Sequence, residues 1–322
     1  MQRFKRILAV YHDDIGADNV FSHAVALARQ NDARLTLLDV VPERYATPAG
    51  ERERFKRLQR LLPAIQAEGV DDADVRVLSG TPFLEIIREV IREEHDIVIT
   101  SPETSTGLSG LYLGSTTTHL VRKCPCPVWV VKPNQDGRYA NILACIDPRS
   151  NDGSENQLDQ KIVDLAASLA TSNGASLHVV HAWDVEGRDL DSIRSEIADQ
   201  VRRDILEKHK GLHSDRVRTV LEEGPIAKLS PQLHLPRGSQ PHREILKLVE
   251  TESIDLIVMG SVVKTGISGL LIGSEAESIL AQIRCGLLSV KPDGFRTPVH
   301  RVHVPAGKNR KHERRSSLEG AL

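Results

Sequence analysis

A glycine-rich segment occurs twice in the chain, in a form that could hold an anion. In the second half it runs from Gly260 to Ser274 (GSVVKTGISGLLIGS), and in the first half from Ser101 to Ser115 (SPETSTGLSGLYLGS). Each segment follows a predicted buried strand and ends in Gly-Ser, where Ser274 or Ser115 could cap the next helix. Backbone N–H groups at a helix start attract phosphate, and glycine permits close approach. The pattern indicates a phosphate-type site, although glycine at a strand–helix turn also occurs for steric reasons alone.

The spacing of the cysteine and histidine residues gives little indication of a metal or redox site. Cys124 and Cys126 are separated by one residue, not by the two residues typical of zinc or dithiol redox pairs. Cys126 also aligns with Cys285 at a strand entrance, which favours a packing role. His178 and His181 lie three apart on a predicted strand, so they should face opposite sides and should not bind one ion together. We expect no metal site.

Acidic and basic clusters were considered for catalysis and nucleic-acid binding. Asp13, Asp14 and Asp147 follow predicted strands, but no motif places a nucleophile or a histidine with them. The basic stretch 52–60 (RERFKRLQR) has apolar residues at helical spacing and is interpreted as a solvated helix face. Aromatic residues make up only 3%, too few for base-stacking platforms. The sequence therefore predicts neither an enzyme nor a nucleic-acid-binding protein.

Short apolar runs alternate with helical patterns, which predicts the elements that carry these segments. A βαβα order with nearly continuous apolar strands indicates an α/β fold with a doubly wound parallel sheet of five strands in each half. Any ligand should then bind beyond the carboxyl ends of the strands. The predicted strands are Ile7–Tyr11, Leu35–Val40, Val75–Leu78, Asp96–Thr100 and Val128–Val131, then Ile142–Ile146, Leu177–His181, Gln232–Leu235, Asp255–Met259 and Leu287–Val290. The predicted helices of the first half are Phe21–Gln30, Glu51–Gln66, Pro82–Glu94 and Ser115–Lys123.

The two halves are copies of one unit. Asp96–Ser115 aligns with Asp255–Ser274 without a gap, and RILAVY and ARLTLLDV near the start match NILACI and ASLHVVHA. The spacing between matches grows along the chain, so the second unit carries extra length in two loop or helix regions. We predict one domain at 1–135, a second at 138–294, and a disordered basic tail at 295–322.

Composition limits the binding partners and the cellular compartment that we expect for the protein. The 322 residues are 40% hydrophobic, with 42 Lys+Arg against 44 Asp+Glu and a net charge of −2. This balance gives no general attraction to nucleic acid or anionic membranes. No apolar run approaches the ~18 residues of a membrane span. The chain has 4 cysteines, which is not a disulfide scaffold, so we expect a cytoplasmic protein.

Taken together, the duplication, the Gly-Ser helix starts and the closing Val-Lys-Pro strands resemble the universal stress protein family in its tandem-domain form. The segments that carry the resemblance are His119–Lys132 (HLVRKCPCPVWVVK), Thr265–Ser268, Gly273 and Arg284–Asp293 (RCGLLSVKPD). It covers about residues 3–294. The resemblance implies that the two units pair through their last strands, Val128–Val131 and Leu287–Val290, as an intramolecular pseudo-dimer. A further homodimer is left open.

The resemblance also implies which residues would hold a cofactor. Nucleotide-binding members carry Gly, two residues, Gly, nine residues and then Gly-Ser/Thr, with Asp after the first strand and a small apolar residue after the second. In the second unit this pattern assigns ATP- or AMP-binding positions to Asp147, Ala182, Gly260, Gly273 and Ser274.

Both units depart from the family pattern. In the second unit Val263 replaces the middle glycine, and a β-branched residue does not easily adopt positive φ. In the first unit Ser101 and Thr104 replace both early glycines, and His12 stands where Asp is expected. The first unit is therefore not expected to bind ATP in the family's manner.

These implications lead to one expected function and two alternatives. The first is a non-enzymatic stress-response binding protein with a degenerate nucleotide-type crevice, which acts through a partner or through another small-molecule ligand. The second is an ATP/AMP-binding stress sensor that uses the second domain. A slow ATPase is the third and the least favoured, because no catalytic base or metal motif is visible.

Overall fold

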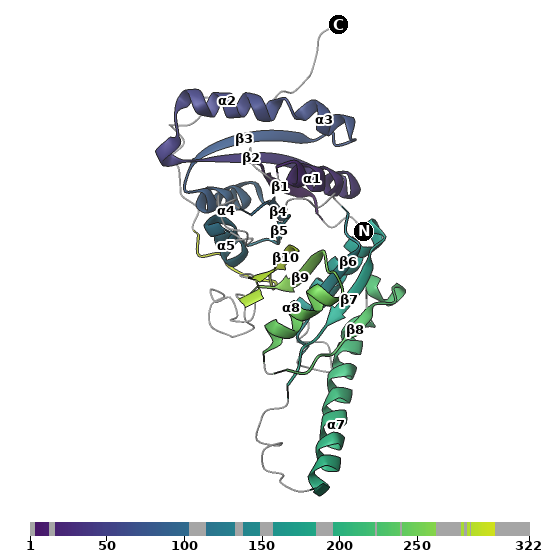
Figure 1. Ribbon diagram of the computed structural model, residues 1–322. Helices are drawn as coiled ribbons and strands as arrows, with labels where there is room; N and C mark the ends of the chain where they lie inside the picture. Colours follow the sequence, from purple (N-terminus) through teal and green to yellow (C-terminus); the bar gives the residue numbers. More distant parts are fainter. Residues whose placement is uncertain are drawn as a thin grey trace.

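The computed structural model places the strands of the described residues in one ten-stranded sheet, shown in Figure 1. It describes residues 4–12, 17–102, 114–132, 138–148, 157–184, 196–222, 224–238, 240–261, 278–279, 282–283 and 285–299. The strand order is β3-β2-β1-β4-β5-β10-β9-β6-β7-β8. Each half of the sheet is parallel, and the two halves meet at the antiparallel pair β5–β10. The predicted α/β architecture and the internal pairing of the last strands are confirmed.

The strands closely follow the predicted apolar runs. They are β1 Arg6–Val10, β2 Arg34–Pro42, β3 Ala73–Gly80, β4 Ile97–Thr100, β5 Val128–Val130, β6 Asn141–Cys145, β7 Ser176–Val180, β8 Gln232–His234, β9 Leu256–Gly260 and β10 Gly286–Val290. The helices are α1 Ala17–Asn31, α2 Pro48–Gln59, α3 Leu62–Ala67, α4 Pro82–Glu93, α5 Gly114–Lys123, α6 Gln157–Asn173, α7 Glu196–Leu221 and α8 Pro241–Thr251, with short 3-10 turns at Glu43–Tyr45 and Pro225–Lys228.

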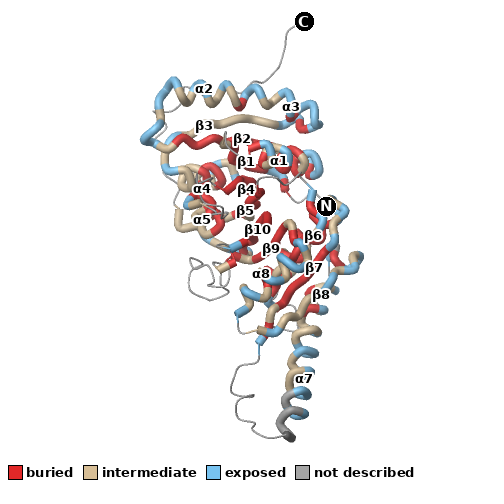
Figure 2. Tube along the Cα trace, viewed as in Figure 1, coloured by how far each residue is buried: buried red, intermediate tan, exposed pale blue. Residues whose placement is uncertain are grey.

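Alternation along the strands sends successive side chains to opposite faces of the sheet. In β1, Ile7 and Ala9 enter a core shared with α1 and α6, whereas Leu8 and Val10 enter a core shared with α4, α5 and α8. Each core contains residues of both halves. Figure 2 shows the resulting band of buried strands through the middle of the molecule. Helices therefore cover both faces, as a doubly wound sheet requires.

The duplication is visible in individual hydrogen bonds. The Asp96 carboxylate accepts the backbone N–H groups of Lys5 at 2.6 Å and Arg6 at 3.2 Å. The Asp255 carboxylate accepts those of Ala140 and Asn141 at 2.7 and 2.9 Å. We call the half from β1 to β5 the N-terminal unit and the half from β6 to β10 the C-terminal unit.

The two units differ most between their second and third strands. The helix predicted at Glu51–Gln66 is two helices, α2 and α3, because Pro63 lacks a backbone N–H and fits only the first turn of a new helix. In the C-terminal unit the same connection holds the 26-residue helix α7. The extra length predicted for the second unit therefore includes a long helix. No helix among the described residues has the length and apolar character needed to cross a bilayer.

Two buried lysines link the units at their junction. The Lys132 ammonium, which follows β5, donates to the carbonyl of Ile283 at 3.0 Å. Lys291, which follows β10, donates to the carbonyl of Val121 in α5 and to the Ser261 hydroxyl. Each unit therefore supplies a cation to the main chain of the other, and such contacts of a buried ammonium offset part of its desolvation cost.

Candidate functional site

Each unit has a crevice position where the strand order reverses, between β1 and β4 in the N-terminal unit and between β6 and β9 in the C-terminal unit. Ligands of open α/β sheets bind at this point, beyond the carboxyl ends of the strands. The residues that leave the strands there are His12 and Ser101 in the first unit, and Asp147 and Gly260 in the second. The predicted residues therefore lie at the point where the strand order reverses, Asp147 just after β6 and Gly260 at the end of β9.

Asp147 presents its carboxylate to solvent. Its side chain is 62% exposed, and its backbone N–H donates to the carboxylate of Asp159, a buried residue in the first turn of α6, at 3.0 Å. His181 Nδ1 lies 3.9 Å from Asp147 Oδ1 and 3.3 Å from the Ile146 carbonyl. An exposed carboxylate fixed in this way can accept hydrogen bonds from an entering ligand.

Gly260 has a packing reason to be glycine. A Cβ at this position would lie 3.1 Å from the Leu158 side chain of α6. The next residue, Ser261, is buried, and its hydroxyl donates to the carbonyl of Val121 at 3.2 Å. The glycine-rich segment therefore begins against α5 of the other unit, which supports the steric interpretation of Gly260 beside the phosphate one.

Ala182 follows β7, and its two neighbours in the sequence, His181 and Trp183, both carry aromatic rings. His181 Nε2 is 2.8 Å from His213 Nδ1, and the His213 ring stacks on Trp183 with centroids 5.2 Å apart. Burial lowers the pKa of His181, and burial with the neighbouring His181 and Arg216 lowers that of His213 to about 4. His213 belongs to α7, so this helix contacts the residues on both sides of Ala182 in the sequence. No sequence motif identified it.

The phosphate end of the predicted site falls outside the described residues, because Gly273, Ser274 and Val263 all do so. In the N-terminal unit the equivalents of Gly273 and Ser274, Gly114 and Ser115, are described, whereas Thr104, the equivalent of Val263, is not. Helix α5 begins at Gly114, which has a φ of 70°, and Ser115 follows it in the first turn. The Gly-Ser pair thus does start a helix in that unit, with its glycine in a conformation that other residues rarely adopt.

In the N-terminal unit a charge cluster surrounds Asp39 next to His12. Asp39 on β2 is fully buried, and its carboxylate lies 2.8 Å from Arg54 Nη1, 3.3 Å from His12 Nδ1 and 3.7 Å from Arg57 Nη2. Burial would raise the pKa of Asp39, but the hydrogen bonds and charges of His12 and Arg54 outweigh it and hold the pKa below its usual value. The basic stretch 52–60 is therefore only partly a solvated face, because Arg54 is bound inward.

Asp39 was missed by sequence reasoning, yet a signal existed. It is the one carboxylate in the run LTLLDVV, and a charge within a buried strand needs a partner. The alignment of the two units places Asp39 at the position of His181 and His12 at that of Asp147. The same pair of residue types therefore meets in both units with the two positions exchanged.

The other groups considered in the sequence have separate surroundings. His178 Nδ1 lies 3.1 Å from Nε2 of His234, whereas His181 contacts His213, so the predicted separation of His178 and His181 is confirmed. Cys124 and Cys126 are buried, with their sulfurs 3.5 Å apart. Among the described side chains, no group of three or more His, Cys, Asp or Glu could hold a metal ion.

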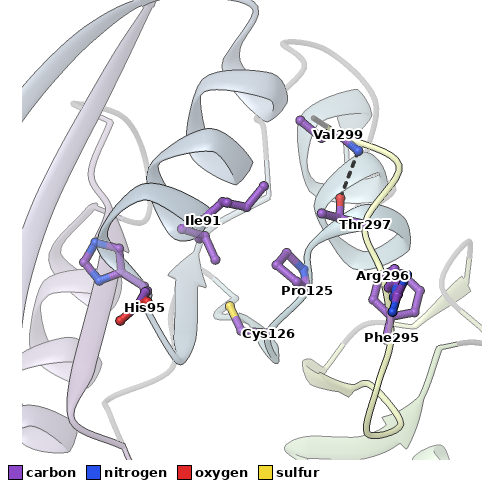
Figure 3. Close-up of a pocket in the computed structure, with 10 residues that line it drawn as sticks. Ile91, His95, Pro125, Cys126, Phe295, Arg296, Thr297 and Val299 are labelled. Carbon is purple, nitrogen blue, oxygen red and sulfur yellow. Dashed lines mark hydrogen bonds between the residues drawn. The ribbon is translucent and has the colours of Figure 1, made fainter. Parts of the chain in front are cut away.

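A cavity of about 520 Å³ lies away from the crevice, at the amino end of β5. Figure 3 shows Pro125 and Cys126 between Ile91 of α4 and the segment Phe295–Val299, with the ring of His95 pointing away from Cys126. The segment after β10 therefore lies against the N-terminal unit. None of the predicted site residues lines this cavity.

Comparison with known proteins agrees with this architecture. The model of the universal stress protein family matches residues 3–132 and 138–291. Universal stress protein E of Escherichia coli K12 is 31% identical over 224 residues, which is 69% of each chain. A functionally unknown protein from Pseudomonas aeruginosa PAO1 superposes with a TM-score of 0.73 at 24% identity, covering 91% of this chain and 95% of its own. A universal stress protein from Archaeoglobus fulgidus gives 0.60 at 17% identity, covering 89% and 98%. The chain therefore belongs to the universal stress protein family.

Proposed function

We propose that this chain is a non-enzymatic binding protein of the stress response, acting in the cytoplasm, with one open ligand crevice in its C-terminal unit. The observation that carries the proposal is the contrast between the crevice positions. In the N-terminal unit Asp39 is fully buried under His12 and Arg54, whereas in the C-terminal unit the side chain of Asp147 is 62% exposed. Of the described carboxylates at these two positions, Asp147 is the one that a hydrogen-bond-donating ligand can reach.

The crevice is of the nucleotide type but degenerate. Asp147, Ala182 and Gly260 stand at positions where nucleotide-binding relatives carry equivalent residues, and Val263 replaces a glycine of the phosphate loop. A β-branched residue there opposes the positive φ that brings backbone N–H groups close to phosphate. We therefore expect weak binding of ATP, or preference for a ligand without a triphosphate. All four cysteines are free thiols, which suits a reducing compartment.

The alternative is an ATP/AMP-binding sensor that uses the C-terminal unit. The position of Asp147 and Gly260 at the reversal of strand order favours it, because this is where α/β sheets bind nucleotides.

Equilibrium dialysis separates these two functions. The full chain is dialysed against ATP or AMP in the presence of Mg²⁺, at nucleotide concentrations up to about 1 mM. A dissociation constant of that size corresponds to a binding free energy of only ~4 kcal/mol. Asp147→Ala and Gly273→Val test the C-terminal unit, and His12→Ala is the matched control at the equivalent position of the N-terminal unit. Saturable binding below this concentration that is lost in the first two variants and kept in the control supports the sensor.

Absence of binding, with another small molecule retained through gentle purification and identified by mass spectrometry, supports the degenerate crevice. Phosphate release that copurifies with the chain and is lost in Asp147→Ala would overturn the non-enzymatic proposal.

A further inference from the structure

Two thiols of the N-terminal unit lie in contact beside a cavity. Cys124 directly follows α5 and Cys126 shortly precedes β5, and their sulfurs are 3.5 Å apart. Cys124 is fully buried, whereas Cys126 is 8% exposed and lines the cavity of about 520 Å³ at the amino end of β5. Figure 3 shows the Cys126 sulfur on the side of the residue that faces Ile91. A small molecule in the cavity therefore meets Cys126 first.

The duplication shows how much of this arrangement packing explains. Cys126 aligns with Cys285, which lies just before β10 and is also buried, so one cysteine packs at this position in both units. The position of Cys124 is held by Ile283 in the C-terminal unit. An apolar side chain is therefore sufficient there, and packing alone does not require the second thiol.

The surroundings of Cys124 favour its thiolate. Burial would raise the pKa of Cys124, but hydrogen bonds from the thiol and the backbone N–H of Cys126, together with the charge of the Lys291 ammonium, lower it. For Cys126, burial and the neighbouring Cys124 raise the pKa. The pair can therefore hold one thiolate, and proton transfer across the sulfur contact decides which sulfur carries it. Because Lys291 follows β10, both units contribute to this site.

Two adjacent cysteines form a disulfide in two steps when the oxidant is a hydroperoxide. The Cys126 thiolate attacks the terminal oxygen of the peroxide, the O–O bond breaks, and the leaving oxygen takes up a proton. Cys126 is then a sulfenic acid, and the Cys124 thiolate attacks its sulfur and displaces hydroxide, which leaves as water. The two thiols supply both protons and both electrons, so one hydroperoxide gives one disulfide, one alcohol (or water) and one further water.

The cavity suits a small hydroperoxide, because its volume far exceeds the roughly 30 Å³ that one water occupies. Its lining includes the apolar residues Val90, Ile91, Pro125, Phe295 and Val299. We propose that Cys124 and Cys126 are a reversible redox site, oxidised to an intramolecular disulfide by a small hydroperoxide in this cavity and reduced again by small thiols. Transient disulfides of this kind are the usual ones in reducing compartments. The site is independent of the crevice in the C-terminal unit.

Treatment of the reduced full chain with hydrogen peroxide tests the proposal. Trypsin releases residues 124–138 (CPCPVWVVKPNQDGR), which contain both thiols. The disulfide appears as a peptide that resists alkylation and is lighter by about two hydrogen masses, and dithiothreitol should reverse both changes. Cys145 and Cys285 are controls in the same sample, because burial raises the pKa of both thiols. Residues 124–138 should be oxidised about tenfold faster than either control.

Variants assign the roles of the two sulfurs and of Lys291. In Cys124→Ala the sulfenic acid of Cys126 should persist and react with dimedone, whereas in Cys126→Ala the buried Cys124 should stay a thiol. Lys291→Met should move the rise of the oxidation rate to higher pH, because the ammonium no longer favours the thiolate. Lys132→Met is the matched control, since it removes the other buried ammonium of the junction and should leave this pH profile unchanged.

Residues 124–138 that remain fully alkylated while Cys145 or Cys285 is oxidised overturn the proposal. Disulfides that form between chains instead of within this peptide also overturn it, as does a Cys124→Ala chain in which dimedone does not label Cys126.

Discussion

The carboxyl edges of the two units use the same two side-chain types in opposite order. In the N-terminal unit the strand residue is the acid, Asp39, and the residue beyond the first strand is His12, 3.3 Å away. In the C-terminal unit the residue that directly follows the second strand is His181 and the residue beyond the first strand is Asp147, 3.9 Å away. The exchange decides which charge is buried. A buried carboxylate needs cations and recruits Arg54, whereas a buried neutral histidine needs only one more hydrogen-bonding group and leaves Asp147 exposed.

The helix that follows the second strand also contacts its unit differently in the two halves. Helix α2 lies on β2 and β3, where Leu58 is fully buried and Arg54 reaches Asp39. Helix α7 packs on the rest of the C-terminal unit through Val217 and Val220 near its C-terminal end, and its His213 contacts His181. Among the described residues, the acid beside the first strand is therefore buried in the N-terminal unit and exposed in the C-terminal unit.

The largest expected contrast comes from one leucine on each of these helices. Leu58→Ala should lower the free energy of unfolding by about 2–4 kcal/mol, because a fully buried side chain leaves a cavity. Leu212→Ala should change it by less than about 0.5 kcal/mol in dilute samples, because Leu212 is 39% exposed.

Urea unfolding can follow the units separately, because the chain has 2 tryptophans, with Trp129 in β5 and Trp183 just after β7. Variants that retain one tryptophan each report one unit. A loss of about 2 kcal/mol in Leu212→Ala would contradict the described exposure of α7.

The next contrast is between the stability costs of replacing the two acids, Asp39 and Asp147. Asp39→Asn should cost about 2 kcal/mol, since it removes charge-assisted hydrogen bonds from a fully buried group and leaves Arg54 without its partner. Asp147→Asn should be nearly neutral for stability, because its side chain is 62% exposed. Chemical denaturation of both variants checks this, and equal costs would mean that the two edges are built alike.

Much of this architecture is readable from the sequence, because repetition and apolar periodicity are redundant signals. The alignment of Asp96–Ser115 with Asp255–Ser274 predicts two like units, and the short strands predict a parallel sheet. The pairing of β5 with β10 came from family resemblance, since nothing in Val128–Val131 alone identifies its partner.

The candidate site was less predictable, because its decisive contacts join residues that are distant in the chain. Arg54 was interpreted as part of a solvated face, and only the structure places it on Asp39. His213 contacts His181 from an inserted helix that follows no repeat pattern. The assignment of Asp147 and Gly260 to one site came from the family resemblance, and the structure places both residues where the strand order reverses, Asp147 after β6 and Gly260 at the end of β9.

A smaller contrast concerns the lysines at the junction of the units. Burial lowers the pKa of both Lys132 and Lys291 from 10.5 to about 8. Between pH 8 and 10.5 the unfolded chain therefore binds more protons than the folded chain, so these groups make stability rise with pH over this window. In the variants Lys132→Met and Lys291→Met, the free energy of unfolding should rise less steeply with pH over this window.

Free energies of unfolding at pH 8 and 9 test this prediction. Above pH 9 the thiol of Cys285, whose pKa burial raises to about 12, acts in the opposite direction. A rise that is equally steep in both variants and the wild type would show that the junction lysines stay charged.

The smallest expected effect is the order in which the carboxyl edges of the two units lose stability as the pH falls. His213 has a folded pKa of about 4 against 6.5, so the unfolded chain binds the extra proton first and the contribution of this group to stability falls as the pH drops from 6.5 to about 4. Asp39 has a pKa below 3.8, so the stability it confers is lost only below that range. The C-terminal edge should therefore weaken before the N-terminal edge. Because Trp183 stacks on His213, Trp183 fluorescence in a Trp129→Phe variant should titrate near pH 4, and His213→Leu should abolish the transition. A midpoint near 6.5 would mean that His213 is solvated, and that α7 does not contact His181 and Trp183.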